Sequence, residues 1–138
     1  MAPIYLGLIL LSAAAIAFEV TLTRLFSVTQ WYHFAFLAVS VALLGYGASG
    51  TALSLVPSWS RPPVARRAST VATVFTAGVV AAYLCLNYLP FDSYRIAWER
   101  IQLLYLVLYY LALAVPFFCA GLVIGLLLVA HPQRAARL

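Results

Sequence analysis

The sequence predicts an all-α fold: an integral membrane bundle of four transmembrane helices, with both termini in the cytoplasm. Hydrophobic residues make up 66% of the 138 residues and charged residues only 8%, whereas a soluble domain carries about 25% charged residues. Four apolar runs each reach the roughly 20 residues that cross a bilayer. Several tryptophans and tyrosines stand near the ends of these runs, where amphipathic rings settle at membrane interfaces. We expect a single transmembrane domain over residues 1–138.

The first span is expected over residues 4–26, where Glu19 and Arg24 interrupt an otherwise apolar sequence. The triplet Ala15-Ile16-Ala17 resembles a signal-peptide cleavage box. A secretory signal normally carries Lys or Arg before its apolar core, and Met1-Ala2-Pro3 carries neither. We therefore expect this helix to be retained.

The second span is expected over residues 31–55, which contain no charged residue. Pro57 and the run Arg61-Pro62-Pro63 end it, because proline cannot continue a helix without losing a backbone hydrogen bond. A polar loop is expected over residues 58–68.

The third span is expected over residues 69–89, with Ser69 or Thr70 as its N-cap and Pro90 as its end. The mixed apolar and charged segment 91–102 follows. Its composition is compatible with a short amphipathic helix in the membrane interface. Within it, Arg95 and Glu99 are four residues apart and would pair on one helical face.

The fourth span is expected over residues 103–130 and is the longest, which favours a tilted helix. Pro116 lies inside it and predicts a kink, which neighbouring helices can tolerate within a bundle. His131-Pro132 ends this span.

An even number of spans puts both termini on the same side of the membrane. The sequence assigns five arginines to that side and three to the other, where Asp92 and Glu99 offset part of the charge. Under the positive-inside rule, the termini then lie in the cytoplasm. The first group is Arg61, Arg66, Arg67, Arg134 and Arg137; the second is Arg24, Arg95 and Arg100. Arginines dispersed in this way indicate topology signals and lipid-headgroup contacts, and not a nucleic-acid surface.

Two patterns of small residues predict close helix packing. In the second span they recur at alternating spacings of three and four: Ala35, Ala38, Ala42, Gly45, Ser49 and Ala52. The fourth span contains Gly121 and Gly125, a small-xxx-small motif. Such faces let helix backbones approach closely in lipid. For the stripe of the second span, the alternative is a groove for a cofactor. The glycine motif of the fourth span would pack either within the chain or against another subunit.

One polar cluster is expected at the first helical hairpin, formed by Glu19, Arg24, Gln30 and His33. An ionisable residue inside a membrane is a functional hypothesis by default. Proton transfer, cation binding, or ligation of a haem or chlorophyll-type metal by His33 are the functional alternatives. We favour a hydrogen-bonded polar plug that fixes the hairpin.

Motifs for catalysis and metal binding are missing from the sequence. There is no GxxxxGK[ST] phosphate-binding loop, HExxH or CxxC motif. Cys85 and Cys119 each stand alone in an apolar run, which is typical of inert buried thiols. We therefore expect no catalytic residue, no metal site and no cofactor of the chain's own.

Three stretches resemble the N-terminal transmembrane region of membrane-bound spermidine synthase-like proteins. They are Phe18–Ser27, the sequence from Trp31 to Gly50, and Pro116–Gly125. The resemblance implies a membrane domain that, in that family, precedes further spans and a soluble aminopropyltransferase-like domain. The 138 residues contain no such soluble domain, so the resemblance implies membrane placement and not catalysis.

We expect a non-enzymatic accessory or structural subunit that docks onto a larger membrane protein complex and stabilises it. Its partners would be other membrane subunits and lipids, with contact to lipids or pigments of the partner complex. The expected location is the inner membrane (plasma or intracytoplasmic), and a respiratory or photosynthetic reaction-centre and antenna complex is the expected host. One alternative is the membrane half of a split aminopropyltransferase-like enzyme. Another is a small transporter or proton channel that uses Glu19 and His33.

Overall fold

The computed structural model describes residues 2–29 and 33–130 of the chain. Within these ranges, each of the four long α-helices is apolar enough to cross a membrane, which confirms the predicted all-α, multi-pass membrane bundle. The helices are α1 (Ala2–Thr29), α2 (His33–Leu55), α3 (Val64–Tyr88) and α4 (Ile101–Ala130), and two short 3-10 turns are η1 (Pro57–Ser60) and η2 (Ser93–Arg95). The placement of the termini in the cytoplasm stays a prediction.

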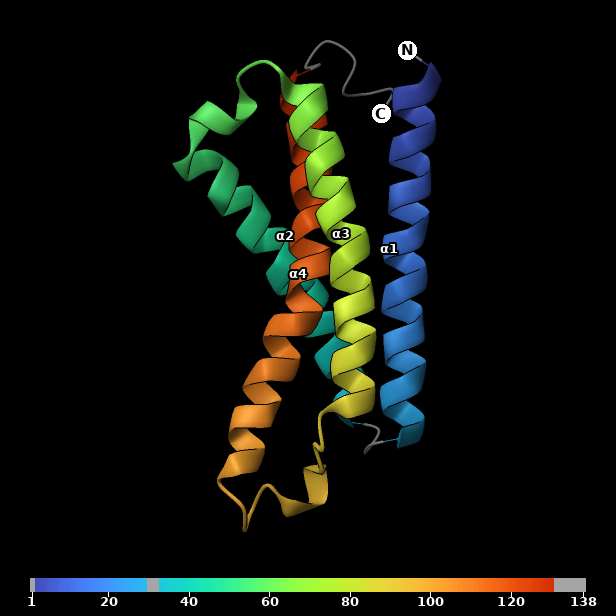
Figure 1. The fold of residues 1–138 in the computed structure, drawn as a ribbon, viewed down its shortest axis with the longest axis vertical. Coiled ribbons are helices and arrows are strands. Elements are labelled where there is room, and N and C mark those ends of the chain that lie inside the picture. Colours follow the sequence, from blue (N-terminus) through green and yellow to red (C-terminus); the bar gives the residue numbers. More distant parts are fainter. Residues whose placement is uncertain (1, 30–32, 131–138) are drawn as a thin grey trace.

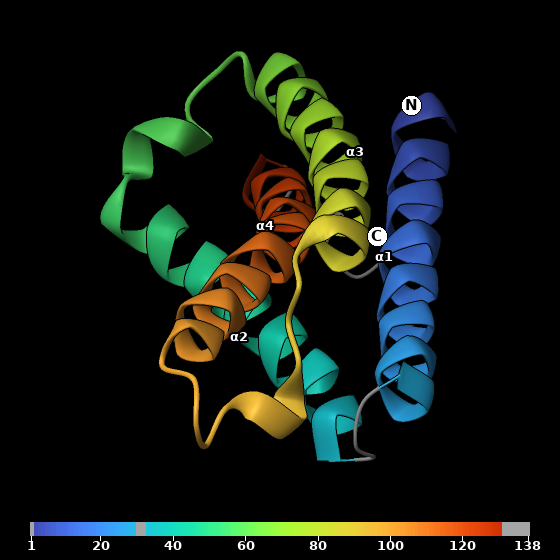
Figure 2. The same ribbon diagram turned by 60° about the horizontal axis from the view of Figure 1, so that its bottom comes forward.

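Helix α4 is the centre of the bundle and packs along both α2 and α3 (Figure 1). Half of its membrane-spanning stretch is buried within the chain, against 11% for α1. Helix α1 packs mainly against α2 and lies at the edge of the bundle (Figure 2). The start of α1, turn η1 and the end of α4 lie at one end of the bundle, called here the η1 end, and η2 lies at the opposite end, the η2 end (Figure 1).

A single phenylalanine joins three of the helices in the core. Phe117 of α4 is fully buried. Its ring lies 5.4 Å from that of Phe18 in α1 and 5.9 Å from that of Tyr46 in α2, measured between ring centroids. Tilted and edge-to-face contacts at these distances are favourable beyond the apolar area that they bury. Phe117 thereby ties the weakly packed α1 to the α2–α4 pair.

The third helix begins earlier than the sequence predicted. It starts at Val64, directly after Pro63 in extended conformation, so the predicted N-cap at Ser69 or Thr70 is wrong. Arginines and alanines, which favour helices, fill the first turn. Thr70 lies within the helix, where its hydroxyl donates a hydrogen bond to the carbonyl of Arg66 at 3.0 Å.

The connection between α3 and α4 is not the amphipathic helix that segment 91–102 suggested. Only turn η2 forms before α4 begins at Ile101. The reason is local: a carboxylate oxygen of Asp92 accepts a hydrogen bond from the backbone N–H of Tyr94 at 2.9 Å. Such a side-chain turn competes with the hydrogen-bond pattern of a helix.

Helix α4 changes direction partway along its length (Figure 1), and Pro116 lies inside it. The ring of Pro116 is buried and faces Gly78 of α3. A Cβ atom at Gly78 would stand 3.4 Å from the ring, in van der Waals contact, so α3 lies close to the proline here. The predicted kink is therefore packed against a matching small residue on the neighbouring helix.

Candidate functional site

The small-residue stripe of α2 faces α4 within the same chain. Ala38, Ala42, Gly45 and Ser49 are buried, while Ala52 is half-buried. At Gly45, the backbones approach so closely that an added Cβ would stand 2.8 Å from the nitrogen of Phe118. The side chain of Ala35 lies outside the described part of the chain. The stripe is thus occupied by helix packing, and not by a cofactor groove.

The glycine motif of α4 lies on the opposite side of the same seam. A Cβ at Gly121 would overlap the side chain of Ser49, and one at Gly125 would overlap that of Leu53. The Ser49 hydroxyl donates to the carbonyl of Tyr46 at 2.7 Å, so it needs no other partner. The motif therefore packs inside the chain, which resolves the two possibilities that the sequence left open.

A second face of α2, which the sequence analysis did not identify, points away from the bundle. Gly47 lies two residues after Gly45, or about 200° around the helix, and no atom lies within 4 Å of a Cβ built there. Four exposed small residues lie on this face, at spacings of seven, four and three, and are here called the outer stripe: Ser40, Gly47, Thr51 and Ser54. The exposed leucines Leu43 and Leu44 stand between the first two of them.

The predicted polar cluster of the first hairpin is described only in part. Glu19 is half-buried and Arg24 is exposed, and the described residues contain no ion pair between them. Gln30 and the side chain of His33 lie outside the described part of the chain. The structure therefore brings none of these four side chains into a described contact with another.

Glu19 lies deep in the membrane-spanning part of α1. At 1.5 Å per residue it lies about 5 Å along the axis from the middle of the helix, well within a hydrocarbon core of about 30 Å. Thr23 follows Glu19 by four residues and so lies on the same face of α1. Its hydroxyl donates a hydrogen bond to the backbone carbonyl of Glu19 at 2.9 Å, and not to the carboxylate. The half-buried carboxylate of Glu19 is thus not held by Thr23.

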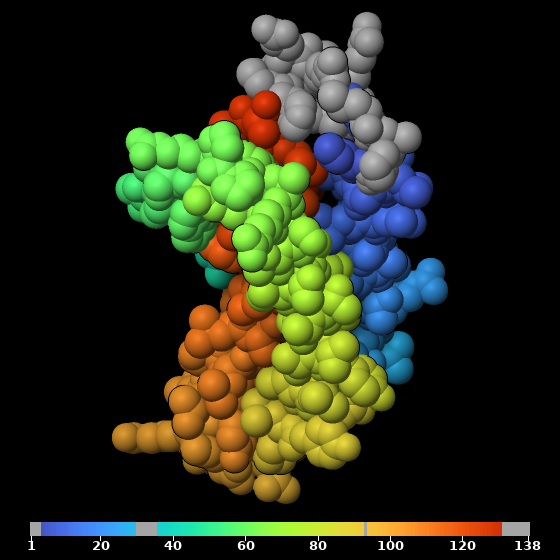
Figure 3. Space-filling model, turned by 45° about the horizontal axis from the view of Figure 1, so that its top comes forward, coloured from blue at the N-terminus to red at the C-terminus, as the bar shows by residue number. Residues whose placement is uncertain are grey.

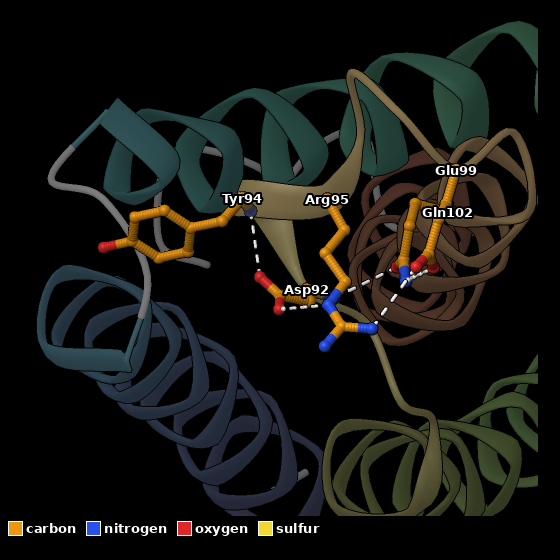
Figure 4. Close-up of polar contacts among 5 residues, drawn as sticks. All are labelled: Asp92, Tyr94, Arg95, Glu99 and Gln102. Atoms are coloured by element: carbon orange, nitrogen blue, oxygen red, sulfur yellow. Dashed lines mark hydrogen bonds and ion pairs between the residues drawn. The ribbon is translucent and has the colours of Figure 1, made fainter.

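A polar network at the η2 end holds the α3–α4 connection (Figure 4). Arg95 contacts Asp92 at 3.4 Å and Glu99 at 3.3 Å, so the predicted Arg95–Glu99 pair is present. Gln102, only 4% exposed, accepts from the backbone N–H of Asp92 at 3.0 Å and donates to Glu99 at 3.3 Å. The sequence analysis missed Gln102, although its spacing of three from Glu99 at the start of an apolar run was a usable signal.

Tyr109 of α4 satisfies the end of α3. Its hydroxyl lies 3.3 Å from the carbonyl oxygens of both Leu86 and Leu89. The last carbonyls of a helix have no partner within that helix, and in a membrane an unsatisfied carbonyl is costly. The hydroxyl of Tyr109 therefore has its hydrogen-bond partners inside the chain.

Neither cysteine is part of a described cluster that resembles a metal site. Cys119 is buried and Cys85 is half-buried. Among residues 2–29 and 33–130, no group of three His, Cys, Asp or Glu side chains is placed to hold a metal ion.

In comparisons with known proteins, no family model, curated protein or solved structure matches the chain. The resemblance to membrane-bound spermidine synthase-like proteins therefore stays a prediction.

Proposed function

We propose that the chain is a non-catalytic membrane subunit that docks onto a larger membrane protein complex and stabilises it. The outer stripe of α2 carries this proposal. The docking partner is a transmembrane helix of another subunit, which lies along Ser40, Gly47, Thr51 and Ser54.

Small residues on the surface of a membrane helix allow another helix to approach closely. Lipid tails are as apolar as leucine, so helix association in membranes depends on close van der Waals contact, for which small residues are suited. The inner face of α2 already demonstrates this use, because Gly45 admits the backbone of α4. The outer stripe also consists of small residues, all of them exposed, and a Cβ built at Gly47 meets no described atom of another helix within 4 Å.

The hydroxyl groups of the outer stripe do not disturb such a contact. Ser40 donates to the carbonyl of Phe36 at 3.0 Å, and Thr51 donates to that of Gly47 at 3.1 Å. Ser54 donates to the carbonyl of Thr51 at 2.8 Å. Because each hydroxyl is satisfied by its own helix, the partner helix meets a surface that is small in shape and costs no unsatisfied polar group. From Ser40 to Ser54 the stripe extends about 21 Å, most of a bilayer core.

The remaining parts of the proposal follow from the sequence. The host is a bioenergetic complex of the inner membrane, either respiratory or a photosynthetic reaction centre with its antenna. The chain contributes no catalytic residue and no cofactor of its own, and contacts lipids or pigments of the host.

The test is recovery of the partner from native membranes extracted in a mild detergent. Wild-type protein is compared with Gly47→Leu and Thr51→Leu, and co-purifying polypeptides are quantified by mass spectrometry. Thr73→Leu is the matched control, because Thr73 is an exposed threonine of α3 whose hydroxyl also bonds the carbonyl four residues back at 3.1 Å. We expect the stripe variants to lose at least about nine-tenths of the partner and the control to retain it, because Gly47→Leu adds four carbon atoms to a close contact and Thr51→Leu adds two while removing a hydroxyl.

Two results would overturn the proposal. One is a wild-type protein that isolates as a monomer with no membrane partner, even after cross-linking in the membrane. The other is equal partner recovery from stripe variants and control. Recovery of a second copy of this chain as the sole partner also contradicts a heterologous host. Recovery of a soluble aminopropyltransferase-like protein would instead favour a split enzyme.

A further inference from the structure

A cavity of about 530 Å³ opens at the η1 end of the bundle, between η1, α3 and α4. In Figure 3, the first turns of α3 (green) lie beside the last turns of α4 (red) at this end. Its rim carries Trp59, Arg66 and Arg67, and its wall is formed by Val71 of α3 with Leu122 and Leu126 of α4. The cavity is thus basic at its mouth and apolar inside.

Within the described residues, no carboxylate balances the charge at the rim. The first turn of α3 contains no acidic residue, and within the described residues the only carboxylate ion pairs involve Arg95, at the other end of the bundle. Arg66 is exposed. Two guanidinium groups that line one cavity, with no described carboxylate paired to them, favour an anion, and arginine matches the geometry of phosphate oxygens.

Arg67 is held in place by the turn that precedes it. Its Nη1 atom donates to the carbonyl of Ser58, to that of Trp59 at 2.8 Å and to that of Arg61 at 3.0 Å. The guanidinium is therefore fixed at the rim before any ligand arrives, so little conformational entropy is lost on binding. The same bonds hold Trp59 beside the cavity.

The depth of the cavity matches the upper part of a phospholipid. Leu126 and Leu122 lie four and eight residues before the end of α4, or about 6 and 12 Å from it along the helix. Both leucines line the cavity although only 2% and 5% of their surface is exposed, and half-buried Val71 offers more of the apolar wall. A headgroup at the arginines would therefore place the first part of an acyl chain against Val71 and the exposed edge of these leucines, while Trp59 stands at the interface that its ring prefers.

We propose that this cavity binds one anionic phospholipid, with its phosphate between Arg66 and Arg67 and an acyl chain along Leu122 and Leu126. Basic cavities between transmembrane helices are suited to such headgroups. The inference goes beyond the docking role and does not depend on the outer stripe, because it concerns the isolated chain.

Native mass spectrometry of the purified full-length chain tests the site. The protein is titrated with phosphatidylglycerol or phosphatidylcholine, and the fraction that retains one lipid is measured. We expect phosphatidylglycerol to be retained in preference, because the choline cation would meet two guanidinium groups. Arg66→Gln should weaken its retention about five- to tenfold, whereas Arg100→Gln, an exposed arginine at the η2 end, should leave it within about twofold.

A second pair of variants tests the cavity without changing charge. Thr70 lines the cavity, so Thr70→Trp should fill it and abolish retention. Thr73→Trp places the same ring one turn further along α3 and should not. Thermal unfolding of each variant without lipid identifies any that fail to fold, and Arg66→Gln, at an exposed side chain, keeps the test available if Thr70→Trp does not fold.

Several outcomes would overturn the assignment. Equal retention of the two lipids, or unchanged retention by Arg66→Gln or by a folded Thr70→Trp, would remove the headgroup site. Thermal stabilisation by inorganic phosphate equal to that by phosphatidylglycerol would show a phosphate site with no role for the acyl chain. An acidic peptide from a partner that displaces the lipid from wild-type protein at equal concentration would assign the arginines to a protein contact instead.

Discussion

Replacing Gly45 by alanine should separate α2 from α4 and destabilise the bundle. The added Cβ would stand 2.6 Å from the Cβ of Phe117, 2.8 Å from the nitrogen of Phe118 and 2.9 Å from the carbonyl oxygen of Ala114. Carbon atoms pack best at about 3.5–4.0 Å, so the overlap is about 1 Å. Two of the three opposing atoms are backbone atoms, which cannot rotate away. The helices must therefore move apart by about this distance.

The expected cost follows from that displacement. A gap of about 1 Å forfeits up to half of the dispersion energy of each affected contact, and overpacking a core typically costs about 1–3 kcal/mol. We expect a loss of about 2 kcal/mol, which is about a 30-fold change in the unfolding equilibrium. Gly47→Ala, on the same helix with open space around it, should be neutral or stabilise by up to about 1 kcal/mol.

Reversible unfolding in mixed micelles with a rising fraction of denaturing detergent measures both variants. Tryptophan fluorescence reports the transition, and the change in its midpoint at constant slope gives the stability difference. If Gly45→Ala and Gly47→Ala unfold at the same midpoint as wild type, then the α2–α4 seam does not have the close approach described here.

Three further predictions concern the hydrogen bonds that hold the helix ends. Tyr109→Phe should lower the free energy of unfolding by about 1 kcal/mol, because the carbonyls at the end of α3 lose their donor. Tyr88→Phe is the control and should leave this free energy unchanged, because Tyr88 is 81% exposed. Gln102→Leu should lower the free energy of unfolding by about 1–3 kcal/mol and speed hydrogen exchange across the α3–α4 connection. Arg95→Gln should lower it by no more than about 1 kcal/mol, because the ion pairs of Arg95 are largely exposed. Equal losses of stability in the two variants would contradict this ranking. Arg67→Gln should speed hydrogen exchange in η1 at least about tenfold and leave the exchange rate in η2 unchanged, because Arg67 bonds three carbonyls at η1. If η1 exchanges as slowly as in the wild type, these three contacts do not hold the turn.

The four helices could be predicted because their signal is local. Length, apolar composition and proline punctuation lie along the chain itself, and a bilayer sets the required length. The start of α3 was missed because Ser69 and Thr70 are good caps in isolation, whereas Pro63 and the residues after it already suit a helix start. Propensity is a weak guide where two starts compete within five residues.

The pairing of the seams could not be predicted, because it is a property of the whole bundle. The stripe of α2 and the glycines of α4 each indicate close packing, but neither pattern states its partner. Adjacency in the chain favours α1 as the partner of α2, yet α2 packs more extensively against α4. Gln102 and Arg67 were missed for a related reason: they bond backbone groups whose positions depend on turns that sequence spacing does not define.

The two faces of α2 allow stability and docking to be tested separately. Gly45 and Gly47 are two residues apart, yet a Cβ at the first meets the backbone of α4 while a Cβ at the second meets nothing. If the outer stripe serves a partner, Gly47→Leu should abolish partner recovery and leave the unfolding midpoint of the isolated chain unchanged. Gly45→Ala should lower the midpoint, yet retain the partner under conditions where the bundle stays folded. Loss of both properties in both variants would mean that α2 acts as one packing unit, and the docking role would then have no support from its outer face.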